Sequence, residues 1–163
     1  MNDRLPWWRG ARGEWYVAAQ LGLMILVFFG PRTAWGLLAW PAPIAHVCTF
    51  AGIALMLAGL TLLVAGGFRL GAHLTPLPYP SPHGPLHSAG AYGIVRHPMY
   101  GGGVILAYGW ALLVHGWLTL AYASVLFAFL DFKSKREERW LVEKFPDYPE
   151  YRRRVRKLIP FVF

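Results

Sequence analysis

Two clusters of ionisable side chains flank a long uncharged stretch of this chain. The first is Arg96-His97, directly followed by Pro98, and the second is the pair Glu137-Glu138. Proline is favoured in the first turn of a helix and keeps the preceding residue out of helical geometry, so His97-Pro98 predicts a helix start. The free N–H groups at that start, beside Arg96, suit a carboxylate or a phosphate. A carboxylate of the second cluster can accept hydrogen bonds from a ribose diol.

Each cluster also has a purely structural interpretation. The first would mark the membrane boundary and cap a helix, and the glutamates would pair with Lys133, Arg136 and Arg139 on their own helix. However, acidic residues beside a basic membrane face run against the local charge preference, which favours a functional use for the glutamates. Tyr92 or Tyr100 would then pack against an adenine.

The chain between the two clusters must bring them together. Residues 101–130 contain no charged side chain and would be about 45 Å long as one helix, whereas the hydrocarbon core of a bilayer is about 30 Å thick. This length is too great for one upright span and too short for two complete ones. We therefore expect a tight helical hairpin that turns at His115-Gly116-Trp117, with arms extending into residues 96–100 and 131–136. Both clusters would then lie on one face of the membrane.

Apolar segments earlier in the chain predict further spans. Residues 15–29 are apolar except for Gln20, and residues 44–67 form the clearest span. Residues 33–40 are bracketed by prolines, which predicts an interfacial loop. The predicted fold class is all-α: a polytopic integral membrane protein with about four transmembrane helices, including a C-terminal helical hairpin, and with cytoplasmic C-terminal helices.

Composition and charge agree with a membrane protein. Of the 163 residues, 56% are hydrophobic and 15% charged, and no Asp or Glu occurs between Glu14 and Asp131. A soluble core does not need so much uncharged length. The net charge of +8 lies next to apolar segments, where topology and anionic headgroups favour it, so we expect no nucleic-acid partner.

The basic residues also predict the orientation. If both termini are cytoplasmic, four spans place every Lys and Arg except Arg32 on the inner side. The positive-inside rule therefore favours cytoplasmic termini and an active site that faces the cytoplasm. We expect one membrane-embedded domain over residues 1–163, with N-terminal spans in 1–67 and a catalytic part in 68–163.

Two segments on the predicted inner side have their own patterns. Residues 69–95 contain too many prolines for a regular helix or a central strand. They would form either a flexible loop or a stiff extended strap over the site. Residues 133–145 carry charges at helical spacing, and Pro149 is predicted to begin a short helix that extends to Lys157.

An ordered set of motifs resembles one known family. The motifs are Gly90-Ala91-Tyr92, residues 95–102 (VRHPMYGG), Glu137-Glu138-Arg139, residues 148–153 (YPEYRR) and Ile159-Pro160-Phe161. Together they resemble the isoprenylcysteine carboxyl methyltransferase family, with its phospholipid methyltransferase relatives. The resemblance covers residues 69–163. A glycine follows Tyr92, where many relatives carry a basic residue, and eukaryotic prenylcysteine enzymes have more transmembrane helices than the four expected here.

The resemblance implies S-adenosylmethionine in a cytoplasm-facing pocket and a lipid or lipid-like substrate dissolved in the membrane. The methyl acceptor would be a carboxylate or an amine. On this analogy Lys133 lies near the acceptor. If the acceptor is an amine, Glu138 or His97 could accept its proton. We add Arg96 for the cofactor carboxylate, from the helix-start argument. The implied cofactor-binding residues are Gly84, Pro85, Leu86, His87, Tyr92, His97, Pro98, Met99, Tyr100 and Glu137.

Other classes of protein remain open from sequence alone. Six histidines could serve a haem- or metal-binding, redox-linked membrane protein, although they lack compact ligand spacing, and we expect no metal. A membrane reductase with the same fold would need a nicotinamide cofactor. A polytopic scaffold or transporter subunit would carry charges in mid-membrane, which this sequence lacks.

Overall fold

The fold is that of a computed structural model, which describes residues 13–71, 74, 75, 77 and 84–163. Over this part of the chain there are six α-helices and no β-strand, so the all-α prediction is confirmed there. A single parallel bridge pairs Val95 with Arg156. The helices are α1 (Glu14–Phe29), α2 (Ala42–Leu70), α3 (Ala91–Ile94), α4 (Pro98–Leu113), α5 (Trp117–Lys144) and α6 (Tyr148–Arg154).

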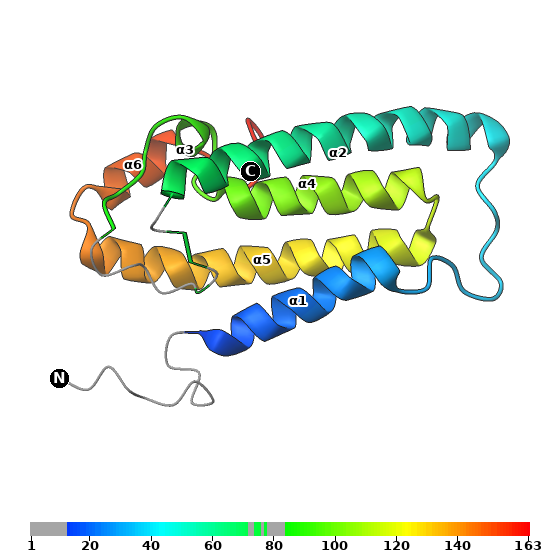
Figure 1. The fold of residues 1–163 in the computed structure, drawn as a ribbon, viewed down its shortest axis with the longest axis horizontal. Coiled ribbons are helices and arrows are strands. Elements are labelled where there is room, and N and C mark those ends of the chain that lie inside the picture. The colour runs from blue at the N-terminus through cyan, green and yellow to red at the C-terminus, as the bar shows by residue number, and fades with distance from the viewer. Residues whose placement is uncertain (1–12, 72–73, 76, 78–83) are drawn as a thin grey trace.

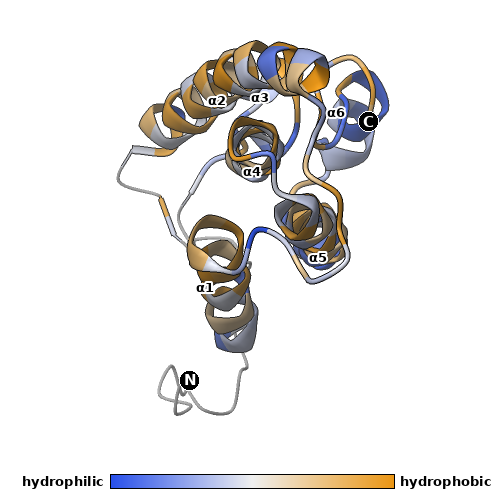
Figure 2. Ribbon diagram, turned by 90° about the vertical axis from the view of Figure 1, so that its right-hand side faces the viewer, coloured by the Kyte–Doolittle hydropathy of each residue, from blue (hydrophilic) through white to orange (hydrophobic). Residues whose placement is uncertain are grey.

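Four of the helices run side by side, each antiparallel to the one before it in the chain, and α4 lies among the other three. Figure 1 shows α4 between α2 and α5, with α1 alongside α5, and the end-on view of Figure 2 places α4 at the centre. Among the described residues, α4 contacts α1, α2 and α5, whereas α1 does not contact α2. The connections that follow α1 and α4 lie at one end, and α3 and α6 lie at the other (Figure 1). The start of α4 and the charged end of α5 are therefore at the same end.

At a row of glycines, α2 and α4 approach so closely that no Cβ atom fits between the two backbones. A Cβ atom on Gly59 would lie 2.7 Å from the carbonyl oxygen of Gly102, and one on Gly52 would lie 2.7 Å from that of Gly109. At the end of this row, a Cβ atom on Gly66 would lie 3.0 Å from the ring of Pro98. Small residues at such spacing let helix backbones pack closely in membrane proteins. This packing fixes the position of the first turn of α4.

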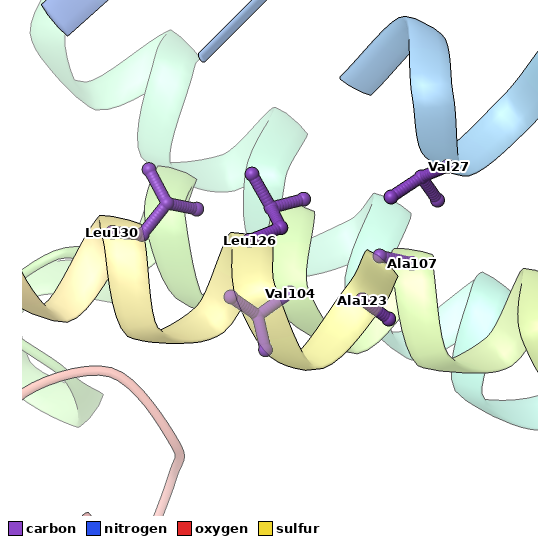
Figure 3. Close-up of a cluster of buried hydrophobic side chains, with 6 residues drawn as sticks. All are labelled: Val27, Val104, Ala107, Ala123, Leu126 and Leu130. Atoms are coloured by element: carbon purple, nitrogen blue, oxygen red, sulfur yellow. The ribbon is translucent and has the colours of Figure 1, made fainter. Parts of the chain in front are cut away.

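A small apolar core joins α1, α4 and α5. Figure 3 shows its six buried side chains, which are Val27 from α1, Val104 and Ala107 from α4, and Ala123, Leu126 and Leu130 from α5. The alanines leave little between the helix backbones, so α4 and α5 form a close hairpin. The core therefore holds the two arms that carry the ionisable clusters.

Much of the outward surface is apolar. Phe29, Phe50 and Phe68 are 84%, 73% and 82% exposed, and Figure 2 shows hydrophobic residues along α1 and α2. Extended exposed apolar surface of this kind marks contact with a membrane or another apolar partner. By length and composition, one described helix, α2 with 29 residues, could cross a membrane by itself, and α1 is a shorter apolar helix.

Several predicted elements are confirmed. The expected span at residues 44–67 lies within α2, and the hairpin turn lies between Leu113, where α4 ends, and Trp117, where α5 begins. His115 in this turn has a φ of 52°, a left-handed conformation typical of tight turns. Residues 31–40 contain no helix, as the flanking prolines predict.

Two details differ from the sequence-based expectation. The helix predicted to extend to Lys157 ends at Arg154, because the backbone N–H groups of Arg96 and His97 donate to the carbonyl oxygens of residues 156 and 157 and hold them in an extended conformation. Residues 69–95 are also not free of helix. They contain the end of α2 and the short helix α3, whose residues lie beyond the last proline of the segment.

Some predictions concern residues whose structure is not described. Much of the proline-rich segment, at positions 72, 73, 76 and 78–83, lies outside the described residues. The same is true of Arg4, Arg9 and Arg12, which were used to predict the orientation. The structure therefore leaves the choice between a loop and a strap as a prediction.

Candidate active site

A pocket lies at the end of the bundle where α4 begins and the charged half of α5 ends. Its empty space, including the open mouth, is about 860 Å³. The wall comes from the end of α2, the segment before α3, the start of α4, the end of α5 and α6. The lining residues are Leu70, Thr75, Leu77, Gly84, Pro85, Leu86, His87, Tyr92, Arg96, His97, Met99, Tyr100, Glu137, Leu141, Lys144, Phe145, Tyr148 and Tyr151.

The start of α4 is built as its sequence predicts. Pro98 occupies the first helical turn and His97 precedes it with φ −125° and ψ 67°, outside helical geometry, as expected for a residue before proline. The ring of His97 stacks on that of Tyr100, with centroids 5.5 Å apart and an interplanar angle of 4°. One helical turn therefore presents two stacked rings to the second cluster.

The two clusters meet through these rings. The Tyr100 hydroxyl donates to Oε2 of Glu137 at 2.9 Å. His97 Nδ1 lies 3.8 Å from the same oxygen, and His97 Nε2 lies 3.2 Å from Oε1 of Glu138. The predicted meeting of an imidazole-bearing helix start with a pair of carboxylates is thus confirmed.

The two adjacent glutamates have different environments beyond the apolar part of α5. Burial raises the pKa of Glu137, although its neighbours His97, Tyr100 and Lys133 oppose this. Burial acts in the same direction on Glu138, but His97 and Arg96 outweigh it and lower its pKa to about 2. The Glu137 side chain is 24% exposed and lines the pocket, whereas that of Glu138 is 4% exposed and does not. Of these two glutamates, only Glu137 can contact a ligand in the pocket.

Arg96 is engaged by the protein itself. Its Nε donates to Oε1 of Glu138 at 2.8 Å, and its Nη1 donates to the carbonyl oxygens of Arg152, at 3.1 Å, and Val155. The side chain is 9% exposed. Arg96 therefore lines the pocket while most of its donors face α5 and α6.

Lys133 lies one helical turn before Glu137 but outside the pocket lining. Its Nζ donates to Oε1 of Gln20 in α1 at 2.6 Å and lies 5.0 Å from the centre of the Tyr100 ring. Lys133 is 1% exposed. The ammonium group therefore lies against the ring of Tyr100, which itself lines the pocket.

The segment before α3 closes one side of the pocket. Lys144 Nζ at the end of α5 donates to the carbonyl oxygen of Gly84 at 3.1 Å, and the rings of His87 and Tyr92 lie 6.0 Å apart. These contacts hold residues 84–87 at the pocket although the preceding residues 78–83 are not described.

The pocket contains ten of the residues predicted for the cofactor, namely Gly84, Pro85, Leu86, His87, Tyr92, Arg96, His97, Met99, Tyr100 and Glu137. Pro98 is buried behind them against α2. The two residues predicted to be catalytic, Lys133 and Glu138, lie beside the pocket rather than in its wall. Their roles, and the binding roles of the other residues, stay predictions.

Sequence reasoning did not assign the aromatic wall from α6. Tyr148 and Tyr151 line the pocket, and the Tyr151 hydroxyl donates to the carbonyl oxygen of Tyr92 at 2.6 Å. The YPEY motif that contains both was part of the family resemblance and was the available signal. The other unassigned lining residues are Leu70, Thr75, Leu77, Leu141, Lys144 and Phe145.

These features suit a nucleoside-sized ligand that carries a positive charge. Tyr92, Tyr148 and Tyr151 offer aromatic surface, and Glu137 offers a carboxylate. The hydroxyl group of Tyr148 is buried without a hydrogen-bond partner among the described residues. A buried, unpaired hydroxyl costs about 1–3 kcal/mol, so an acceptor group on a ligand would relieve this cost. Within the same residues, no group of three or more His, Cys, Asp or Glu side chains could hold a metal ion.

Comparisons with known proteins indicate the family of this chain. The family model for phospholipid methyltransferases matches residues 41–148. Over 75 residues the chain is 40% identical to the protein-S-isoprenylcysteine O-methyltransferase of Schizosaccharomyces pombe, covering 45% of this chain and 32% of the relative. Over 74 residues it is 34% identical to 3-oxo-5-alpha-steroid 4-dehydrogenase 1 of Macaca fascicularis, covering 45% of this chain and 27% of the relative. The chain spans less than a third of the length of either of these curated relatives. No solved structure matches.

The match to the family model identifies the class of protein to which this fold belongs. The family model covers well over half of the chain, from α2 to the first residue of α6. The chain therefore belongs to the phospholipid methyltransferase family, and the resemblance to isoprenylcysteine methyltransferases is confirmed.

Proposed function

We propose that this protein transfers a methyl group from S-adenosylmethionine to a lipid-like acceptor dissolved in the membrane. The observation that carries the proposal is the pocket-facing carboxylate of Glu137, which the Tyr100 hydroxyl holds beside the start of α4. A carboxylate at this position can bind the ribose diol or the positive charge of the cofactor. Tyr92, Tyr148 and Tyr151 would pack against its apolar parts.

The proposal includes four transmembrane helices with the pocket on the cytoplasmic side. In support, the antiparallel order of α1, α2, α4 and α5 places the ends that carry the pocket together. The basic residues Arg69, Arg96 and those of α6 lie at this end, whereas Arg32 lies in the connection at the other end. The positive-inside rule then assigns the pocket end to the cytoplasm.

The residues of this chain would mainly bind and align the reactants. When bound, S-adenosylmethionine supplies a methyl group on a sulfonium that is already activated for transfer. Glu137 and the segment 84–87 would hold the cofactor, Pro98 would set the helix start, and the surrounding tyrosines would exclude water. Neither Glu137 nor Glu138 has to act as a base if the acceptor is an ionised carboxylate.

Two features support a carboxylate acceptor over an amine. An amine must lose a proton during transfer, and the low pKa of Glu138, about 2, makes its carboxylate a weak base. On the side of Tyr100 that faces α1, Lys133 donates a hydrogen bond to the Gln20 amide. The positive charge of Lys133 would attract an anionic acceptor. We therefore propose O-methylation of a carboxylate-bearing lipid, with Lys133 at the acceptor.

The proposal is tested by transfer of an isotope-labelled methyl group from S-adenosylmethionine to lipid-soluble acceptors. We expect transfer to a prenylated cysteine with a free carboxylate and less transfer to vesicles that contain phosphatidylethanolamine. The reverse preference would contradict the carboxylate proposal but keep the methyltransferase. No transfer to either, together with no cofactor binding in calorimetry, would overturn the proposed function.

A matched pair of variants on α5 links the activity to the pocket. Glu137→Gln removes the pocket carboxylate and should weaken cofactor binding by about 10- to 100-fold, since hydrogen bonds to charged groups contribute about 1.5–3 kcal/mol. Glu143→Gln removes the same charge from an exposed position of the same helix and should leave binding unchanged. Equal effects of the two changes would contradict a role for Glu137 in binding.

The reductase alternative has one observation in its favour, the similarity to a steroid 4-dehydrogenase. It is not favoured, because the family whose model covers most of the chain consists of methyltransferases. The same purified protein can be assayed for oxidation of a reduced nicotinamide in the presence of a 3-oxo steroid. We expect none.

A further inference from the structure

The helix α6 supplies part of the pocket wall although it is too short to be stable alone. Its residues Tyr148 and Tyr151 line the pocket and are 1% and 4% exposed. α6 has seven residues, whereas isolated helices shorter than about 12–15 residues are marginal in water. Contacts from other elements must therefore hold this wall in place.

Arg96 provides such a contact at the C-terminal end of α6. Its Nη1 donates to the carbonyl oxygens of Arg152 and Val155. Carbonyl groups at the end of a helix have no partner within the helix, and positive charge is favoured beside them. The guanidinium of Arg96 thus caps α6 from outside.

Glu138 fixes the guanidinium in this position. Its Oε1 accepts from Arg96 Nε at 2.8 Å and lies 3.2 Å from His97 Nε2, and its Oε2 lies 3.4 Å from Nε of Arg152 in α6. Glu138 belongs to α5, so its carboxylate links Arg96 and His97, which precede α4, to α5 and to α6. Because it is nearly fully buried, water does not replace these contacts.

We propose that Arg96 and Glu138 are positioning residues, which hold α6 so that Tyr148 and Tyr151 close the cofactor pocket, and that Arg96 does not bind the cofactor carboxylate. This inference rests on the proposed function for the identity of the cofactor, and it replaces the direct contact that the helix start alone suggests for Arg96. The positioning role requires the branched guanidinium group of arginine at position 96. A lysine ammonium is a single point charge and cannot reach the glutamate and two carbonyl groups from one side in the same way.

The first test measures, without any cofactor, how well the amide groups of α6 are protected from exchange. Hydrogen–deuterium exchange is followed in residues 148–157 for the wild type and for Arg96→Gln, Arg96→Lys and Glu138→Gln. We expect amide exchange in this segment to rise by about 10-fold or more in both Arg96 variants and by less in Glu138→Gln, which keeps a hydrogen-bond acceptor. The control is Arg154→Gln, because Arg154 lies on the same helix, is 70% exposed and pairs only with Glu150 at 3.6 Å among the described residues.

The same preparations separate a local effect on α6 from a general loss of stability. The hydrogen bonds of Arg96 go to Glu138 of α5 and to the C-terminal end of α6. They do not involve the glycines that pack α2 against α4. We therefore expect the thermal midpoint of the Arg96→Lys variant to stay within a few degrees of the wild-type value. If Arg96→Gln does not fold, Arg96→Lys and Glu138→Gln carry the test.

The second test uses two ligands that differ in the amino-acid part. S-adenosylhomocysteine carries the carboxylate, and methylthioadenosine lacks it. If Arg96 acts through the tyrosine wall, Arg96→Lys should weaken both ligands by a similar factor, about 10-fold. Weakening of S-adenosylhomocysteine alone, or unchanged exchange in α6, would overturn the inference. If the wild-type protein binds neither ligand, the proposed function fails, and the exchange experiment still decides whether Arg96 and Glu138 hold α6.

Discussion

The hydroxyl group of Tyr100 donates to Oε2 of Glu137 at 2.9 Å, while the Tyr100 ring stacks on His97. This contact joins the first turn of α4 to the charged part of α5. Tyr100 belongs to α4, and α4 is positioned by its close contact with α2. The hydrogen bond therefore lets α4 fix the orientation of the Glu137 carboxylate. The glycine contact between α2 and α4 therefore affects the site although it lies outside the pocket.

Removal of this hydrogen bond should change the pH dependence of cofactor binding. Burial raises the pKa of Glu137, and the bond from Tyr100 opposes the rise by favouring the ionised form. In Tyr100→Phe the pKa should rise further. The ionised carboxylate is the form that binds a cationic ligand, so affinity should be lost at a higher pH on acidification than in the wild type.

The measurement is the dissociation constant for S-adenosylmethionine between about pH 5 and pH 8. Tyr108→Phe is the matched control, since the Tyr108 hydroxyl bonds to Ser124 at 2.9 Å, away from the pocket. It should leave the pH dependence as in the wild type. An acid limb at the same pH in Tyr100→Phe would show that Glu137 does not control binding.

The hydroxyl of Tyr148 should have opposite effects on the free and the bound protein. It is buried without a partner among the described residues, so Tyr148→Phe should leave the free protein equally stable or stabilise it by about 1 kcal/mol. If the hydroxyl bonds to the cofactor, the same change should weaken binding by about 5- to 10-fold. The two readouts are the thermal midpoint without ligand and the affinity for S-adenosylhomocysteine.

Tyr151→Phe provides a contrast for this prediction. The Tyr151 hydroxyl already donates to the carbonyl oxygen of Tyr92 at 2.6 Å, so its removal should destabilise the free protein by about 1 kcal/mol or more. A lower midpoint for Tyr148→Phe than for Tyr151→Phe would show that the Tyr148 hydroxyl is not unpaired.

Lys133 should affect methyl transfer without affecting cofactor binding. It lies on the α1 side of Tyr100, bonded to Gln20 and outside the pocket wall. Lys133→Met should lower transfer by about 10-fold or more, as expected from loss of a charged hydrogen bond to the acceptor, while the cofactor dissociation constant changes by less than about 3-fold. Lys135→Met on the same helix, where the side chain is 61% exposed, should change neither. A fall in cofactor affinity equal to the fall in transfer would contradict an acceptor role.

The glycine row between α2 and α4 should be intolerant of a single methyl group. In Gly59→Ala the Cβ atom would lie 2.7 Å from backbone atoms of Gly102 and Leu106, which cannot move without separating the helices. We expect a loss of about 1–3 kcal/mol in stability. Gly67→Ala, also in α2, meets nothing within 4 Å and should be neutral or slightly stabilising. Thermal unfolding in one detergent compares the two, and equal midpoints would contradict the close packing of the helices.

Local physics made several features of this protein predictable. Pro98 fixes a helix start because its ring sets φ and lacks an N–H group, and the uncharged length of residues 101–130 demands a turn near its middle. The site residues near His97 could be predicted because the hairpin returns α5 to the level of that helix start. The sequence did not predict that Tyr148 and Tyr151 of α6 line the pocket. The place of a seven-residue helix depends on its tertiary contacts, here those with Arg96 and Glu138, and the sequence does not show these contacts.

The sequence by itself determined that two ionisable clusters face each other across a helical hairpin, because helix length and the absence of charge leave the chain no other route. The tertiary structure alone decided that Glu137 faces the pocket and Glu138 faces Arg96 and α6. Consecutive residues of a helix point about 100° apart, so one carboxylate must turn away from the ligand. Which one turns away depends on the rotation of α5 against α4, and the packing of Val104 and Ala107 against Ala123 and Leu126 sets that rotation.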